Sequence, residues 1–165
     1  MSKVKTVVVG GVLFSHGCHA IDILQWIFGQ PVEVAGLGTT AGTEWMEGEG
    51  THHGLMKFES GALAHVIASW GMKYAKPPAL MHVHTPEACF VVRNNKLAVI
   101  TKEGTKTLYE PSEPPQQHSR FIAECDHFLN CIQTGSRPIT DGHEALKSHR
   151  IIWEIENHQG TLLRF

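Results

Sequence analysis

Two histidines, an aspartate and a serine are spaced so that they can share one side of a helix. His16, His19 and Asp22 recur every three residues, and Ser15 lies four residues before His19. Residues three and four apart are neighbours on a helix surface. An imidazole exchanges a proton near neutral pH, and a nearby carboxylate can orient its ring or favour its charged form. His19 is therefore a candidate acid or base, with Asp22 as its partner.

The residues from His16 to Phe28 carry the helical pattern that would position this group. Gly29 and Pro31 are predicted to end the helix. Because much of its circumference is apolar, we expect other elements to cover most of it, and its polar groups to be hydrogen-bonded inside or to line a cavity. The apolar face is formed by Ala20, Ile23, Leu24, Ile27 and Phe28.

The middle of the chain is rich in strand patterns separated by short turn signals. Such short connections favour antiparallel pairing, since parallel crossovers need a dozen or more residues. We expect a fold of class α+β with an open, mostly antiparallel sheet of about six strands. Two amphipathic helices follow, and Asp141 with Glu144 resembles a capping box at the start of the second. The strand patterns cover residues 32–39, 51–58, 62–70, 80–84, 88–93, 97–101 and 105–109.

The N-terminal residues Lys3 to Val9 have the β-branched composition of a buried first strand. In a dinucleotide-binding fold such a strand leads into G-x-G-x-x-G. Here Gly10 and Gly11 are followed by an apolar triplet with no glycine before Gly17, so we expect no cofactor-binding residues in this chain. Residues 1–10 are either an ordinary leading strand or the vestige of a Rossmann domain, and residues 11–165 are expected to form one domain.

Composition limits the remaining classes of function. The 165 residues, 42% of them apolar, suit one compact domain, and the net charge of −2 lacks the basic patches of nucleic-acid or anionic-membrane binders. No apolar run is long enough for a transmembrane span. The four cysteines have no C-x-x-C spacing, which favours reduced thiols and a cytoplasmic location.

The stretch from Gly10 to Gly29 resembles the motif of the Gfo/Idh/MocA oxidoreductases. That motif has a glycine pair, an apolar triplet, Gly-x-His-x-x-Asp, an apolar run, Trp and Gly, and Gly17, His19, Asp22 and Trp26 all stand in place. Three further blocks agree in order, so the chain is identified as a member of this family, and specifically as its C-terminal domain. These blocks are residues 58–64 with Ser69-Trp70, residues 128–138 and residues 140–146.

The resemblance implies an open sheet with helices on one face and an oligomer interface on the other. It also implies NAD(P)-dependent chemistry at a carbinol carbon of a sugar or polyol, with His19 and Asp22 as catalytic residues. Ser15 stands where many members carry an aspartate, so part of the proton-transfer work could pass to His16. We assign both of these residues to substrate binding. An aromatic platform beside polar donors suits a sugar face, which adds Trp70, Lys73 and Tyr74, although edge aromatics often only pack.

We therefore expect the C-terminal substrate-binding and oligomerisation domain of an NAD(P)-dependent sugar or inositol-like polyol dehydrogenase. Without a nucleotide loop, the isolated chain should hold no cofactor and should be inactive in hydride transfer. Its expected partners are further copies of itself, as a dimer or a larger homo-oligomer, and a sugar or polyol ligand. A stand-alone oligomeric carbohydrate-binding or interaction domain is an open alternative.

The twelve histidines leave a second alternative open, a metal-dependent sugar isomerase or hydrolase. Alternation along a strand puts His82 and His84 on one face, and His52, His53 and His65 lie on strands that could neighbour it. A second candidate cluster is His16, His19 and Asp22. No recognised ligand spacing joins these residues, so we assign no metal ligands and expect ordinary core or surface histidines.

Overall fold

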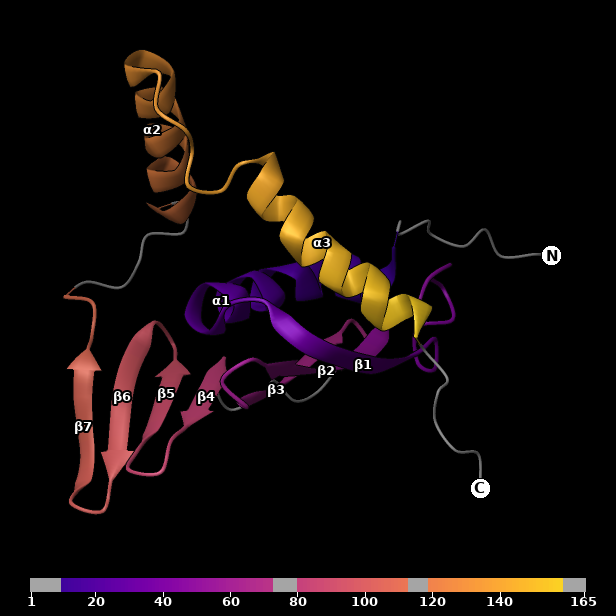
Figure 1. Cartoon of the computed structure of the whole chain (residues 1–165), viewed down its shortest axis with the longest axis horizontal. Coiled ribbons are helices and arrows are strands. Elements are labelled where there is room, and N and C mark those ends of the chain that lie inside the picture. Colours follow the sequence, from indigo (N-terminus) through magenta and orange to yellow (C-terminus); the bar gives the residue numbers. More distant parts are fainter. Residues whose placement is uncertain (1–9, 73–79, 113–118, 159–165) are drawn as a thin grey trace. The chain divides into compact units, whose positions relative to one another are not determined.

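The computed structural model describes residues 10–72, 80–112 and 119–158 (Figure 1). The N-terminal strand pattern at Lys3 to Val9, and with it the interpretation of residues 1–10, lies outside the described residues. The chain divides into two compact units, residues 1–73 with 139–165, and residues 74–138. The expectation that residues 11–165 act as one domain stays a prediction.

The first unit packs two helices on one face of a three-stranded antiparallel sheet (Figure 1). Its sheet has the order β1-β2-β3, and α3 contacts β1 and α1. On β2 the residues with even numbers face the helices and are buried, whereas His53 and Leu55 point to the open face. The elements are η1 (Leu13–Gly17), α1 (Cys18–Phe28), β1 (Pro31–Thr39), β2 (Thr51–Phe58), β3 (Leu63–Ser69) and α3 (Gly142–Asn157).

The core lies between this sheet and the helices. The rings of Phe28 and Phe58 lie 5.2 Å apart and join the end of α1 to the sheet. At the other end, Phe14 stacks on His149 of α3 with a centroid distance of 4.5 Å. These contacts join α1 to the sheet at its C-terminal end and the preceding turn η1 to α3. The buried apolar side chains of the unit are Val12, Leu13, Ile21, Leu24, Met46, Met56, Phe58, Val66, Ala68, Ile151, Ile152 and Ile155.

The ends of α1 and α3 follow the sequence signals. Gly29 ends α1 with a positive φ of 82°, which glycine adopts without strain. Asp141 caps α3, because its carboxylate accepts hydrogen bonds from the backbone N–H groups of His143 (2.9 Å) and Glu144 (3.1 Å). The Glu144 carboxylate pairs with Lys147 at 2.7 Å. The bond from the Glu144 N–H to the Asp141 carboxylate is one of the two hydrogen bonds of the predicted capping box.

The second unit contains a four-stranded antiparallel meander in the order β4-β5-β6-β7. Asn94 and Asn95, with φ of 51° and 62°, form the tight turn between β5 and β6. The α+β class and antiparallel pairing are confirmed, and the described strands are seven, divided between two sheets. This unit is made of β4 (Met81–His84), β5 (Cys89–Arg93), β6 (Lys96–Thr101), β7 (Gly104–Tyr109) and α2 (Ser119–Thr134).

The coverage of α1 differs from the prediction. Only Ile21 and Leu24 are buried, whereas Trp26 is 87% exposed and Ile27 is 45% exposed. The expectation that other elements cover most of this helix is therefore wrong for the described residues, because α3 and β3 reach only one side of it. None of the helices in the described residues combines the length and hydropathy that a membrane span requires.

Candidate functional site

The helix that carries His19 begins with a π-helical turn, Leu13–Gly17. Gly10 and Gly11 enter it with positive φ of 72° and 64°, and the Val12 N–H donates to the Glu49 carbonyl at 2.9 Å. A π turn adds one residue to a helical turn and is often found at functional sites. This irregular turn lies directly before His19 and contains two of the predicted substrate-binding residues.

His16, His19 and Trp70 come together on the exposed side of this turn. The His16 ring lies 5.2 Å from the Trp70 ring and 6.3 Å from the His19 ring, measured between centroids. Trp70 follows β3, and its backbone N–H donates a hydrogen bond to the Gly50 carbonyl at 2.7 Å. All three rings reach solvent. The geometry thus offers an accessible imidazole beside an aromatic surface.

Ser15 lies in the same turn, but its hydroxyl donates to the Gly11 carbonyl at 2.8 Å. This bond runs back along the helix and fixes the hydroxyl proton, so the oxygen keeps only acceptor capacity toward a ligand. Lys73 and Tyr74, which were also predicted to bind substrate, lie outside the described residues.

Asp22 is held by α3. Its carboxylate accepts a hydrogen bond from the Ser148 hydroxyl at 3.3 Å, and that hydroxyl accepts one from the Gln25 amide at 2.7 Å. Among the described residues, His19 makes a ring contact with His16 and no hydrogen bond to Asp22. No contact among the described residues supports the interpretation of Asp22 as the residue that orients His19. Asp22 instead joins the motif helix to α3.

The entrance to the motif helix does not fit a dinucleotide. A helix N-terminus binds a pyrophosphate through free N–H groups and its positive dipole end. Here a Cβ placed on Gly11 would collide with the Glu49 carboxyl group, and the Val12 N–H already donates to the backbone carbonyl of Glu49. A carboxylate therefore occupies the place where a phosphate would bind. This helix entrance therefore does not fit a pyrophosphate group.

Glu49 also faces a second carboxylate, Glu156 of α3. One oxygen of each group is buried and, among the described residues, accepts no hydrogen bond. Burial, together with the charge of Glu49, raises the pKa of Glu156 above its ordinary value of 4.5. Since ionising both groups in one partly buried place is unfavourable, this pair costs stability at neutral pH.

Replacing Glu156 with glutamine should therefore stabilise the protein at neutral pH. The gain should be about 1 kcal/mol, the low end of the cost of an unsatisfied buried polar atom, because solvent screens a half-buried carboxylate. The raised pKa means that the folded state holds this proton to higher pH than the unfolded chain does. The free-energy cost of ionising Glu156 is thus absent below pH 4.5, the pKa of this group in the unfolded chain. It develops as the pH rises through the higher pKa of Glu156 in the folded protein.

Thermal midpoints of Glu156→Gln and the unchanged protein, measured across this range, check the prediction. The advantage of the variant should shrink as the pH falls toward 4.5, the ordinary value for a glutamate. An advantage that is the same at acidic and neutral pH would contradict it.

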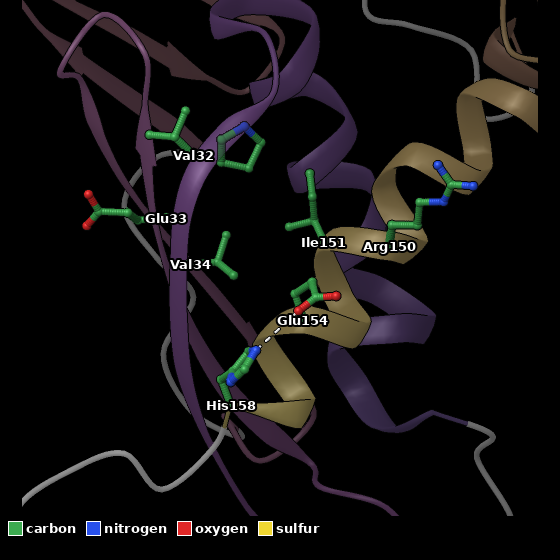
Figure 2. Close-up of a pocket in the computed structure, with 8 residues that line it drawn as sticks. Val32, Glu33, Val34, Arg150, Ile151, Glu154 and His158 are labelled. Carbon is green, nitrogen blue, oxygen red and sulfur yellow. Dashed lines mark hydrogen bonds and ion pairs between the residues drawn. The ribbon is translucent and has the colours of Figure 1, made fainter.

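A groove of about 350 Å³ runs between β1 and α3. Figure 2 shows Val34 pointing from β1 toward α3, whereas Glu33 points away from it. On α3, Glu154 pairs with His158 at 3.2 Å along one edge of the groove (Figure 2). Neither His19 nor any other predicted site residue lines this groove.

The remaining histidines and the motif cysteine have separate surroundings. His53 and His65 face each other on the open side of the first sheet, with Nδ1 and Nε2 3.1 Å apart. His52 is fully buried on the helix side of that sheet, and burial lowers its pKa. Burial raises the pKa of Cys18, which lies between Gly17 and His19 of the motif, and this favours the protonated form of the thiol.

A model of the GFO/IDH/MocA C-terminal domain matches residues 3–105. The chain belongs to this family. A curated relative, scyllo-inositol 2-dehydrogenase (NAD(+)) of Bacillus subtilis, is 24% identical over 142 residues, which cover 82% of this chain and 42% of that protein. The chain thus spans less than half the length of this GFO/IDH/MocA relative.

Solved structures share the fold. The aldose-aldose oxidoreductase of Caulobacter crescentus, in complex with glycerol, has a TM-score of 0.72 at 23% identity, over 90% of this chain and 45% of that one. A UDP-N-acetylglucosamine 3-dehydrogenase of Acidithiobacillus ferrooxidans has a TM-score of 0.67 at 19% identity, over 86% and 44%. These similarities confirm the GFO/IDH/MocA C-terminal fold that the motif predicted.

Sequence reasoning missed Glu49. It lies in a glycine-rich loop, Glu47 to Gly50, with no periodic pattern. The signal that could have found it is the pair of glycines at the motif entrance, because consecutive glycines before a helix often mark a close approach of another group.

Proposed function

We propose that this chain is the substrate-binding and oligomerisation part of an NAD(P)-dependent sugar or polyol dehydrogenase, inactive in hydride transfer by itself. The observation that supports this most is the family motif on an accessible helix side, where the His16 ring lies close to both the His19 ring and the Trp70 ring. The inositol substrate in the name of the Bacillus subtilis relative supports a polyol ligand. The free thiols support a reducing, cytoplasmic location.

His19 is proposed to accept the proton of the reacting hydroxyl group, as an exposed imidazole can at neutral pH. His16 would form a hydrogen bond with a neighbouring hydroxyl group of the sugar. The Trp70 ring would lie against the C–H face of the sugar. Asp22 would keep the helix in place through Ser148. The hydride acceptor is proposed to be an NAD(P) molecule held outside the described residues; the Glu49 side chain beside Gly11 at the helix entrance supports this.

The open face of the first sheet is proposed to bind a second copy of the chain. Several large apolar side chains alternate on this face and point away from the helices. Exposed apolar side chains gathered on one face of a sheet commonly mark an interface between proteins. These side chains are Leu37, Leu55, Leu63 and Ile67, with exposed fractions of 50%, 55%, 79% and 47%.

Calorimetric titration of the pure chain with scyllo-inositol and myo-inositol, beside an assay for NAD(P)H formation, tests the ligand and the inactivity separately. We expect saturable binding without turnover. His19→Ala should weaken binding by about tenfold, the loss of one hydrogen bond to a ligand. His65→Ala, a histidine of the open sheet face, is the matched control and should bind as the unchanged chain does. Turnover by the pure chain, or equal binding by His19→Ala and the unchanged chain, would contradict the proposal.

A further inference from the structure

A second group of side chains with metal-binding chemistry lies on the four-stranded sheet, away from the family motif in the sequence. His82 and His84 of β4 and Cys89 of β5 each offer one donor atom, and these atoms all lie within 4.8 Å of one another. Cys89 Sγ is 3.9 Å from His84 Nε2, and the two imidazole centroids are 6.0 Å apart. Among the described residues, it is the only group of three His, Cys, Asp or Glu side chains with this spacing.

The sheet explains why these three side chains meet. Residues two apart on a strand point to the same face, which aligns His82 with His84. Cys89 is the cross-strand partner of His84 in the antiparallel β4–β5 pair, so it points to that face as well. The connecting turn is fixed by the Thr85 hydroxyl, which donates to the Ala88 carbonyl at 3.1 Å and accepts from the Ala88 N–H at 3.0 Å. The group is therefore held by backbone structure.

The donor set selects the kind of metal. Two imidazoles and a thiolate suit zinc and copper, whereas magnesium and calcium prefer oxygen ligands. In a tetrahedral zinc site with Zn–N of about 2.0–2.1 Å and Zn–S of about 2.3 Å, neighbouring donors lie roughly 3.3–3.8 Å apart. The separation of 3.9 Å between Cys89 Sγ and His84 Nε2 is close to that range. Both histidines are exposed and Cys89 is half-buried, so an ion can reach the donors from solvent.

We propose that His82, His84 and Cys89 bind one Zn²⁺ ion, with the fourth position open to water. Binding replaces the thiol proton of Cys89, which is released to solvent, so affinity should fall as the pH is lowered. This site is independent of the proposed dehydrogenase function, because it shares no residue with the family motif.

Titration of the chelator-treated full chain with Co²⁺, followed by displacement with Zn²⁺, tests the site. Tetrahedral Co²⁺ bound to a thiolate gives visible ligand-field bands and a near-ultraviolet charge-transfer band. We expect both bands at one equivalent, and loss of both on adding one equivalent of Zn²⁺. Absence of the bands, or Zn²⁺ that does not displace Co²⁺ at this stoichiometry, would overturn the proposal.

Variants assign the signal to these residues. Cys89→Ser should abolish the charge-transfer band, whereas Cys125→Ser, which changes an exposed cysteine outside the group, should keep it. His84→Gln should weaken Co²⁺ binding by at least about tenfold, since even outer partners of metal ligands contribute 10–100-fold. His65→Gln should leave it unchanged. Circular dichroism of the metal-free variants verifies folding, and a band that survives Cys89→Ser in folded protein refutes the assignment.

Discussion

Gly36→Ala is expected to lower the free energy of unfolding by about 1–3 kcal/mol. A Cβ on Gly36 would lie 2.5 Å from Ile155 Cγ2 and 2.8 Å from the His53 backbone oxygen. The oxygen belongs to the central strand of the sheet, and Ile155 is fully buried in the core. Neither can move without disturbing the contact between β1 and α3. Equilibrium unfolding in urea measures the loss.

The cross-strand partner of Gly36, Gly54, provides the matched control. A Cβ there would meet Ile155 Cδ1 at 3.4 Å, an ordinary contact distance. Alanine also loses less conformational entropy than glycine when a strand forms, which favours the variant by about 0.5–1 kcal/mol. Gly54→Ala should therefore be neutral or stabilising. Equal losses from the two substitutions would show that close approach at Gly36 is not the cause.

This contrast explains why β1 carries two glycines on its inner face. A Cβ on Gly38 would lie 2.8 Å from Glu49 Cγ and 2.8 Å from His52 Cδ2. Glycine within a strand often marks a close approach of other groups. The two glycines of β1 thus make room for the buried His52 ring, for α3 and for the carboxylate that closes the motif entrance.

The strand pattern could be predicted from the sequence because alternation reports directly on burial. Residues 51–58 were predicted as a strand and form β2 with the same bounds, since its even-numbered residues all face the helices. The division into two sheets could not be predicted in this way. Alternation identifies the buried face of a strand, but it carries no information on whether β3 and β4 pair.

The candidate site was predicted in part. His19 was predicted from the family motif, His16 from its position one turn before His19, and Trp70 from the ring that it could offer a sugar. In the structure the His16 ring contacts the other two rings. The partner of Asp22 did not follow, because Ser148 lies 126 residues away in the chain. For the proposed zinc site, the sequence indicated only two of the three residues, His82 and His84. The third residue, Cys89, could not be predicted, because it lies beside His84 only through the register of β4 and β5, which the sequence does not specify.

Leu55→Asp is expected to convert the proposed oligomer into monomers at micromolar concentration. Leu55 lies at the centre of the open face, on the middle strand between Ala35 and His65, and is 55% exposed. A second copy packed on this face would bury the new carboxylate without a partner. An unpaired buried charge costs about 3–5 kcal/mol, which weakens association by more than about a hundredfold.

Sedimentation velocity of the unchanged chain and of Leu55→Asp measures this change directly. Ile27→Asp is the control variant. Ile27 is 45% exposed, but it lies on α1, in the helix layer behind the opposite face of the sheet. Its aspartate variant should keep the mass of the unchanged protein. If Ile27→Asp dissociates the oligomer and Leu55→Asp does not, the exposed side of α1 is the interface, and the apolar residues of the open sheet bind something other than a second copy. A monomeric unchanged chain would remove the proposed interface altogether, because the four apolar side chains of the open face would then remain in water.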